Sequence, residues 1–293
     1  MKPAPFHYHA PRSLDECLEL LARYGAEAKV LAGGQSLMPM MNFRLARPAA
    51  LIDINRLPAL DHVALTDGVI RVGALVRQRR LERHAEATAR IPLLREALAL
   101  VGHPAIRNRG TVCGSIAHAD PAAELPAALL CLDGRAVVKS RRGERAIAVE
   151  ELFRGPLTTA LEPDELLTEV QFSIPPAGAG SAFLEVARRH GDFALVGAAA
   201  VVQVEAGHGV KSLRLAVFGA GPGPMRSPKA EAVLVGGKAT LPRIAEIRRV
   251  VSDAVKADSD LHATAEYRRR VAGVLAERAV TLAIARCAGK GVA

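Results

Sequence analysis

The chain has 293 residues, half of them apolar, which favours two or three domains with sizeable cores and excludes a disordered chain. Aromatic residues make up 3% of the chain and tryptophan is absent, so a platform that stacks single-stranded nucleic acid is not expected. The net charge of +9 is compatible with an anionic ligand or partner, but the basic residues are scattered. The groups Arg77, Arg79, Arg80 and 268–270 are typical of solvated helix faces or docking surfaces.

The first half of the chain alternates predicted helices and strands. Ser13 and Glu16 form a possible capping box for a helix over 14–23, and Gly25 would end it. Helical spacing also marks 91–101, with a proline near its start. Apolar runs and turn residues predict the following extended segments: strands at 28–32, 49–55, 69–75 and 165–174, and a hairpin over 135–149 that turns at Arg142-Gly143.

The pattern changes after residues 175–181, "PPAGAGS", which have the composition of a linker. Residues 193–222 contain two long apolar strands joined by "AGHG" at 206–209, a hairpin signal. Helical patterns follow at 241–256 and 264–288, and the second would begin near Thr264 and end at Gly289. The sequence therefore predicts an α+β protein, with its best domain boundary near residue 176 and a weaker one near 57.

Two glycine-rich segments carry the functional signal. "LAGGQSLMPMMNFRL" at 31–45 follows a predicted strand, and "RNRGTVCGSIAHADPAAELPAALL" at 107–130 leads through Asp120-Pro121, as N-cap and N1, into a predicted helix. Small residues let backbone N–H groups face a ligand, and the hydroxyls of Ser36, Thr111 and Ser115 can donate as well. Two such loops facing each other would form a cradle for a diphosphate.

General fingerprints leave this interpretation open. The sequence has neither GxGxxG nor GxxxxGK[ST], so a Rossmann or P-loop site is not supported. Each glycine pair alone is also typical of a tight turn, and the group Met38, Met40 and Met41 is typical of core packing. Residue patterns alone predict two candidate anion-binding loops in an α+β protein.

The cysteines and the N-terminus bear on the cellular setting. Cys17, Cys113, Cys131 and Cys287 lie far apart and form no CxxC pair, which excludes a local zinc or iron–sulfur signature. Their use fits a reduced, cytoplasmic setting. Residues 1–10 have no apolar signal core and no apolar run reaches the ~18 residues that span a bilayer. We therefore expect a cytoplasmic protein with no transmembrane segment.

Four segments in the expected order resemble the FAD-binding medium subunit of molybdenum hydroxylases, the family of aerobic carbon monoxide dehydrogenase and xanthine dehydrogenase. "AGGQSLMP" with "RLARP" and "LIDIN" resembles the first flavin loop, and 107–127 resembles the second. "ARRHGDFALVGAAAVV" and "HATAEYRRRVAGVLAERAV" resemble the start and the last helix of the C-terminal domain. The resemblance implies a two-lobed, PCMH-type FAD-binding domain, with lobes at 1–57 and 58–176, followed by a C-terminal antiparallel sheet with helices at 177–293.

The resemblance also implies the cofactor-binding residues, and no catalytic acid, base or metal ligand is expected. The first loop would wrap the FAD diphosphate, where a side chain at Gly33 would occupy the space of the phosphates. Asp120 and Glu124 would lie near the ribityl and flavin end, Leu167 near the isoalloxazine, and His118 would be structural. The full set is Ala32, Gly33, Gly34, Gln35, Ser36, Leu37, Thr111, Val112, Cys113, Gly114, Ser115, His118, Asp120, Glu124 and Leu167.

Two residues depart from the family pattern. Cys113 stands where the second loop usually has glycine, which would be strained if the position needs a positive φ. A thiol beside a diphosphate would be neutral, and emptying the site should expose it and make it more reactive. Leu184 stands where some relatives carry a basic residue near the flavin, a role that Arg188 or Arg189 could fill.

The resemblance implies noncovalent FAD in this chain, and molybdopterin and [2Fe–2S] clusters only in partners. A large molybdopterin subunit and a small [2Fe–2S] subunit would join it, as a dimer of heterotrimers. Electrons would pass from a cluster through FAD to quinone, oxygen or a nicotinamide. The alternative is a self-contained FAD-dependent oxidoreductase of the same flavin fold. A nucleic-acid-binding or scaffold protein is disfavoured because no basic patch is interleaved with aromatic residues.

Overall fold

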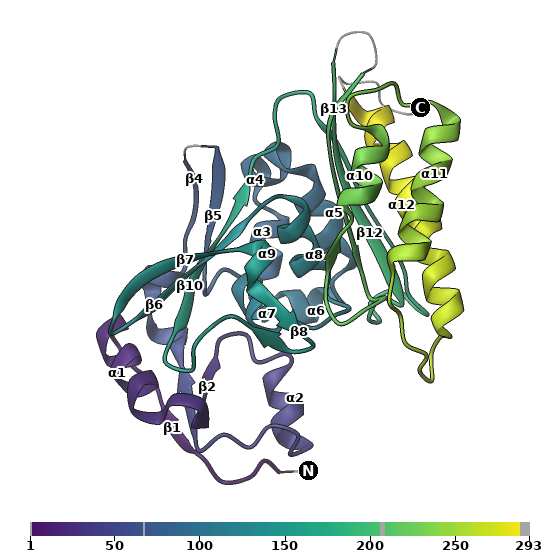
Figure 1. Ribbon diagram of the computed structural model, residues 1–293. Coiled ribbons are helices and arrows are strands. Elements are labelled where there is room, and N and C mark those ends of the chain that lie inside the picture. The colour runs from purple at the N-terminus through teal and green to yellow at the C-terminus, as the bar shows by residue number, and fades with distance from the viewer. Residues whose placement is uncertain (1, 67, 206–208, 288–293) are drawn as a thin grey trace.

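The computed structural model describes residues 2–66, 68–205 and 209–287, and it has the predicted mixture of helices and sheets. Figure 1 shows three parts in chain order: a small lobe in purple, a larger central lobe in blue and teal, and a C-terminal sheet backed by helices in green and yellow. The α+β architecture is thereby confirmed. Among the described residues, no helix is both long and apolar enough to cross a lipid bilayer.

The N-terminal lobe is a parallel sheet of three strands in the order β1-β3-β2. Parallel neighbours need crossover connections, which helices α1 and α2 supply. The elements are β1 (His7–His9), α1 (Leu14–Tyr24), η1 (Gly25–Glu27), β2 (Ala28–Leu31), α2 (Leu37–Asn42), β3 (Ala50–Asp53), and the 3₁₀ turns η2 (Ile54–Arg56) and η3 (Pro58–Leu60).

Helix α1 begins and ends as predicted, with one change in its cap. The Ser13 hydroxyl accepts a hydrogen bond from the Glu16 backbone N–H at 3.2 Å, and Gly25 ends the helix with φ at +51°. The Glu16 carboxylate accepts from the Arg12 N–H at 2.8 Å, one residue before the expected partner. Both ends of the cap are therefore satisfied, but not as a strict capping box.

The central lobe pairs a five-stranded antiparallel sheet, in the order β4-β5-β10-β6-β7, with a group of short helices. The predicted hairpin over 135–149 is present and turns at 141–142. The strands are β4 (Val63–Thr66), β5 (Val69–Gly73), β6 (Arg135–Ser140), β7 (Gly143–Ala148), β8 (Phe153–Gly155), β9 (Thr158–Thr159) and β10 (Leu166–Ser173). The helices are α3 (Gln78–Glu82), α4 (Ala85–Arg90), α5 (Pro92–Leu100), α6 (Pro104–Arg107), α7 (Val112–His118), α8 (Glu124–Cys131) and α9 (Val149–Leu152).

The prediction that Asp120-Pro121 opens a helix is wrong. The Asp120 side chain accepts from the Ala122 N–H at 2.8 Å and closes a local turn, so it is not available as a cap. One helix, α7, ends before it, with Ala119 at a φ of +52°, and the next, α8, begins at Glu124. The small residues of the second loop thus form helix α7 itself rather than a turn that precedes a helix.

The C-terminal part is a four-stranded antiparallel sheet, in the order β11-β12-β13-β14, with α10 and α12 packed on it and α11 packed against these two helices. The two predicted long strands pair as expected. The predicted "AGHG" turn falls largely on 206–208 and the helix end at Gly289, both outside the described residues. The elements are β11 (Gly180–Val186), β12 (Val196–Val204), β13 (Val210–Phe218), β14 (Met225–Arg226), α10 (Pro228–Leu234), α11 (Leu241–Ala254) and α12 (Ala265–Arg286).

Burial on both faces explains why the sequence of strand β12 is continuously apolar. Ala199 and Val201 belong to the core shared with the central lobe, whereas Ala198, Ala200 and Val202 pack in a second core under the helices. A strand buried on both faces has no position for an alternating polar residue. The sheet therefore joins the C-terminal helices to the central lobe through two cores.

The prediction of a linker over 175–181 is wrong at Gly180 and Ser181, which belong to the first strand of this sheet. Gly180 opens β11 and lies against the Ala283 carbonyl of α12, where a Cβ would have no room. The chain passes from β10 to β11 through 174–179. The domain limits at 57/58 and 176/177 fall between strands of different sheets, and we keep them as proposals.

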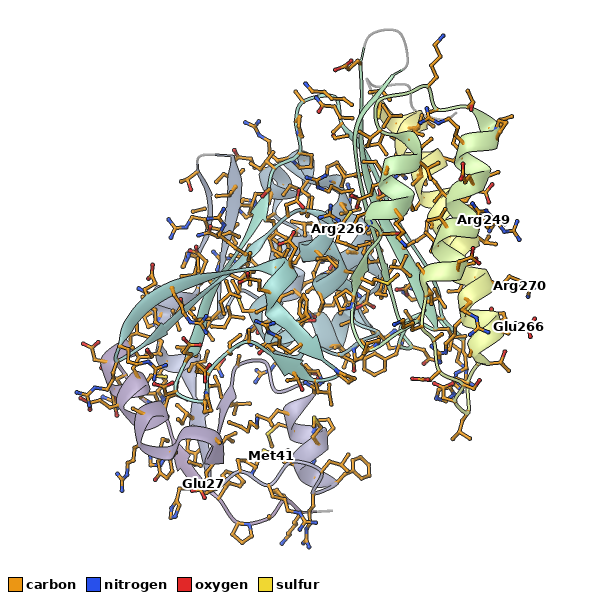
Figure 2. All side chains as sticks on the ribbon, in the orientation of Figure 1. Glu27, Met41, Arg226, Arg249, Glu266 and Arg270 are labelled. Atoms are coloured by element: carbon orange, nitrogen blue, oxygen red, sulfur yellow. The ribbon has the colours of Figure 1, made fainter. Side chains whose placement is uncertain are left out.

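Several arginines expected to be solvated are instead structural. Arg268 is 8% exposed, donates to the carbonyls of Leu195 and Gly219 at 2.7 Å, and pairs with Asp260 at 2.6 Å. By contrast, Figure 2 shows Arg249, Arg270 and Glu266 on the outer side of α11 and α12. The net positive charge is thus divided between internal braces and a solvated helical face.

Candidate functional site

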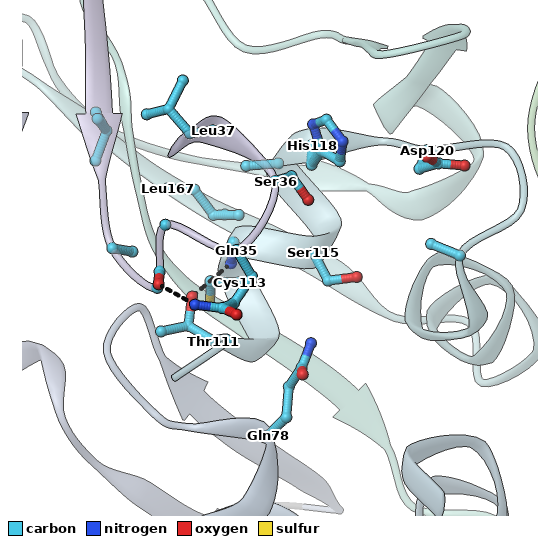
Figure 3. A pocket seen from close by; sticks show the side chains of 18 of the residues that line it. Gln35, Ser36, Leu37, Gln78, Thr111, Cys113, Ser115, His118, Asp120 and Leu167 are labelled. Carbon is cyan, nitrogen blue, oxygen red and sulfur yellow. Dashed lines mark hydrogen bonds between the residues drawn. The ribbon is translucent and has the colours of Figure 1, made fainter. Parts of the chain in front are cut away.

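A cleft with a volume of about 570 Å³ lies where the three parts meet. Its walls come from the segments after β2 and before α7, from 157–167 in the central lobe, and from 191–193 beyond β11. Ligand sites commonly have this size and lie between lobes. Figure 3 shows the polar and apolar side chains that line it.

The first loop continues from the carboxyl end of β2 into α2. Gly34 has φ at +72°, a conformation that favours glycine. A Cβ on Gly33 would lie 2.5 Å from the Arg109 carbonyl oxygen and 2.8 Å from the Gly110 Cα, both backbone atoms of the second loop. Gly33 therefore lets the two loops touch, and the expectation that its missing side chain leaves room for the phosphates is wrong.

The second loop is the start of helix α7. The Thr111 hydroxyl caps the helix by accepting from the Gly114 N–H at 3.0 Å. A Cβ on Gly114 would lie 2.5 Å from that hydroxyl, so the cap requires a residue without a side chain there. Both loops therefore need glycine for close contacts within the protein, Gly33 against backbone atoms and Gly114 against the Thr111 hydroxyl.

Two side chains brace the loops from outside the cleft. Asn55 donates from Nδ2 to the Ala32 carbonyl at 2.9 Å, and its Oδ1 accepts from Arg77 Nη2 at 2.6 Å. Arg77 Nη1 donates to the Arg109 carbonyl at 2.6 Å. Burial, with Arg109 nearby, lowers the pKa of Arg77. The side chains of Asn55 and Arg77 thus form a chain of hydrogen bonds that links the first loop to the second.

Fourteen of the fifteen residues assigned from the sequence line the cleft, and Val112 does not. The Val112 side chain is fully buried in the core, and its N–H donates to the Val76 carbonyl at 3.1 Å. The cleft thus gathers both loops with His118, Asp120, Glu124 and Leu167.

Cys113 is neither strained nor accessible. It lies within α7, outside the set of residues with positive φ, and its Sγ donates to the Val72 carbonyl at 3.4 Å. Protein atoms alone leave it 2% exposed, and burial raises the pKa of the thiol. The position needs no positive φ, so the condition for strain is not met, and the expectation that emptying the site exposes the thiol is wrong.

The acidic end of the cleft carries less charge than its composition suggests. Glu124 is 6% exposed, and burial, followed by the neighbouring Glu185 and Asp120, raises its pKa to about 8. Burial also raises the pKa of Glu185 to about 7 and lowers that of His118, against the opposing effect of Asp120. At neutral pH, Glu124 is therefore a protonated carboxyl that can donate a hydrogen bond to a hydroxyl or carbonyl oxygen.

Several lining residues were not predicted. Gln78 lies in a basic stretch whose pattern indicates only a helix face, so no local signal marked it. Gly191, Asp192 and Phe193 belong to a segment that carried the family resemblance but had been given no place in the site. Ile106 and Phe193 are 40% and 69% exposed and add apolar surface to the cleft.

Leu184, which stands where some relatives carry a basic residue, has a packing role in this structure. Leu184 is partly buried and packs against the core beneath the C-terminal helices. Neither Arg188 nor Arg189 belongs to the lining of the cleft, and Arg188 lies 3.8 Å from Asp192. No basic side chain from this segment lines the described cleft.

Comparison with known proteins gives two consecutive matches. Residues 4–176 match the family described as "FAD binding domain in molybdopterin dehydrogenase", and residues 181–283 match "CO dehydrogenase flavoprotein C-terminal domain". The chain is 40% identical over 286 residues to 6-hydroxypseudooxynicotine dehydrogenase complex subunit alpha of Paenarthrobacter nicotinovorans, covering 98% of this chain and 97% of that relative. It is 39% identical over 287 residues to caffeine dehydrogenase subunit beta of Pseudomonas sp. (strain CBB1), covering 98% and 97%.

A solved structure shows the same architecture. The carbon monoxide dehydrogenase from Hydrogenophaga pseudoflava that lacks the Mo-pyranopterin moiety of its molybdenum cofactor contains a chain that superposes with a TM-score of 0.95. Sequence identity is 36%, and the match covers 98% of this chain and 100% of that one.

Proposed function

Because the chain belongs to the family of FAD-binding medium subunits of molybdenum hydroxylases, which are oxidoreductases, we propose that it binds FAD in the cleft and passes electrons from a partner's [2Fe–2S] clusters to an external acceptor. When bound, FAD supplies the redox chemistry, because it can exchange electrons singly or in pairs. The role of this chain is to bind the cofactor, orient it and limit its contact with water.

The two glycine loops carry the proposal. They touch at Gly33, line one cleft together with Ser36 and Ser115, and leave no room for a Cβ between them. That arrangement suits an extended anionic group such as the FAD diphosphate. The cradle therefore fits the cofactor that the family binds.

The remaining lining residues suit the other parts of FAD. In this proposal, the neutral carboxyl of Glu124 donates a hydrogen bond to a ribityl hydroxyl or to the flavin, and Asp120 accepts one. Leu167, 5% exposed at the cleft wall, packs against the isoalloxazine. None of these groups needs to transfer a proton from a substrate, so we assign no catalytic acid or base.

We further propose that the chain works in a cytoplasmic complex with a large molybdopterin subunit and a small [2Fe–2S] subunit, as a dimer of heterotrimers. The names of its relatives support an assembly, since one is a subunit of a dehydrogenase complex and another a subunit beta. The alternative, a self-contained FAD-dependent oxidoreductase, differs in needing no partner for substrate oxidation.

Reconstitution with FAD tests cofactor binding. The purified chain should take up FAD noncovalently, give the absorption bands of oxidised flavin, and release the flavin on acid precipitation. Gly33→Ala should weaken binding, because its Cβ would meet the Arg109 carbonyl oxygen and push the loops apart. Overpacking of this kind costs about 1–3 kcal/mol, which corresponds to a loss of roughly 5- to 150-fold in affinity.

Gly223→Ala is the matched control. A Cβ there meets no atom within 4 Å and no positive φ is required, so flavin affinity should not change. A wild-type protein that stays colourless in excess FAD would overturn the proposal. Equal FAD affinity in wild type and Gly33→Ala would instead show that the contact between the loops does not shape the site.

A further inference from the structure

Gln78 is a buried polar residue in the wall of the cleft. It is not among the residues assigned so far to FAD binding. It is the first residue of α3 and is 5% exposed, and its backbone N–H donates to the Gly110 carbonyl at 2.9 Å. That bond fixes the start of α3 beside the second loop. Figure 3 shows the side chain pointing toward Ser115.

The carboxamide oxygen of Gln78, Oε1, is buried and has no hydrogen-bond partner in the described part of the chain. Gly110 leaves room for the group, because a Cβ there would lie 2.7 Å from Oε1. Buried polar atoms are nearly always paired, so an unpaired carboxamide in a cleft wall indicates a ligand.

The chemistry of the carboxamide restricts what that ligand can offer. Its oxygen needs a donor, whereas diphosphate oxygens only accept. A sugar hydroxyl both donates and accepts, as a carboxamide does, and FAD carries such hydroxyls on either side of its diphosphate. Gln78 lies beside Gly110 and points toward Ser115, at the loop that the proposed function assigns to the diphosphate.

We propose that Gln78 is a further cofactor-binding residue, whose carboxamide binds a sugar hydroxyl of FAD next to the diphosphate. This inference rests on the proposed function and adds a contact that the glycine loops cannot supply. The hydroxyl belongs either to the ribose of the adenosine half or to the ribityl chain of the flavin half.

Gln78→Met separates a binding role from a structural one. Methionine has a similar length and flexibility but cannot form these hydrogen bonds. Replacing an unpaired buried amide by an apolar side chain should leave the melting temperature of the apoprotein unchanged or raise it. The dissociation constant for FAD, measured by flavin fluorescence, should nevertheless rise by roughly 10-fold. Gln171→Met, outside the cleft and paired with Glu169, is the control and should leave FAD affinity unchanged.

Titrations with FMN and competition by ADP identify the hydroxyl. If Gln78→Met weakens ADP, the contact is to the ribose; if it weakens FMN, the contact is to the ribityl chain. Unchanged FAD affinity in Gln78→Met would overturn the inference while leaving wild-type FAD binding, and thus the proposed function, intact. Weaker FAD binding with both halves unaffected would also overturn it, since the effect would then be indirect. Failure of the wild type to bind FAD would overturn the proposed function itself.

Discussion

Glu124 shows how burial of one side chain sets the charge of the cleft. Its carboxyl lies at the first turn of α8, with Glu185 and Asp120 close enough to raise its pKa further. The sequence places an acidic residue here, and only the fold makes it neutral at pH 7. The same buried environment keeps the Cys113 thiol protonated. The protonation states of both residues therefore depend on the fold and not on residue type alone.

Glu124→Gln should change how the stability of the apoprotein depends on pH. In the wild type, folded and unfolded chains both bind the Glu124 proton below about pH 4.5, so stability is complete there. Between about 4.5 and 8 the folded chain keeps a proton that the unfolded chain has lost, so stability falls as pH rises. The slope from this group is at most about 1.4 kcal/mol per pH unit, and it ends above the folded pKa.

Thermal unfolding at pH 4 and 8.5 measures this effect, because the lower value lies below the range in which the wild type loses stability. Glu124→Gln should resemble the wild type at the lower pH and be the more stable protein at the higher one, because glutamine has no proton to lose. Glu86→Gln, at an exposed position of α4, should follow the wild type at both values. Parallel pH profiles for wild type and Glu124→Gln would contradict a raised pKa at this position.

Short connections, rather than long helices, position the site. The turn η2 after β3 carries Asn55, and the residue before α3 is Arg77, so two segments from different lobes meet across both loops. Asp53 accepts from the Asn55 backbone N–H at 2.9 Å and fixes that turn. The lobes are therefore joined at the site by side chains that do not line it.

Asn55→Ala and Arg77→Ala should each weaken FAD binding without touching the cleft. Each removes one link between the Ala32 and Arg109 carbonyls, and a lost hydrogen bond costs about 1 kcal/mol, or roughly 5-fold in affinity. Because the two side chains belong to one chain of hydrogen bonds, the double variant should lose little more FAD affinity than either single variant. FAD titrations of the four proteins measure this coupling.

Arg80→Ala provides the control for the brace. It breaks an exposed ion pair with Asp61, which belongs to neither loop, and such pairs contribute about 0–1 kcal/mol. FAD affinity should stay at the wild-type value. Additive losses from Asn55→Ala and Arg77→Ala would show that the two side chains act independently rather than as one brace.

The sequence predicts a helix, strand or turn correctly where neighbouring residues determine it. The cap at Ser13, the stop at Gly25, the hairpin over 135–149 and the long helices follow from neighbouring residues, and all are present. The hairpin turns at 141–142, one residue before the predicted Arg142-Gly143. The start of α8 and strand β11 were missed, because a local turn at Asp120 and packing of Gly180 on α12 decide them. Gln78 depends on a contact with Gly110, in a distant segment of the central lobe, and Asn55 on a contact between lobes. No short sequence pattern contains either contact.

The whole molecule is organised by two cores that share one sheet. The first core joins the N-terminal and central lobes and one face of β12, and the second fills the space beneath α10, α11 and α12. The cleft lies against the first core, and its last wall, 191–193, comes from the segment between β11 and β12. The C-terminal part thus contributes residues to the wall of the cleft, in addition to the helices that cover its own sheet.

Charge is distributed unevenly over this framework. Arg107 and Arg268 are buried and hold carbonyls and carboxylates in place, so they contribute to packing rather than to an external field. Other arginines, including Arg249 on α11, form exposed pairs on the helical face. A net charge of +9 still favours association with an acidic partner at low ionic strength.

Co-expression with the genes for a large molybdopterin subunit and a small [2Fe–2S] subunit tests the proposed assembly. The three chains should co-purify, and the complex should associate faster at low salt than at high salt, because screening weakens attraction between exposed charges. Addition of the complex's substrate should bleach the flavin absorption. The isolated chain, reconstituted with FAD, should show no bleaching with the same substrate, since in this proposal the partners carry the substrate site and the clusters. Substrate oxidation by the isolated FAD-loaded chain would contradict the electron-transfer role and favour the self-contained oxidoreductase.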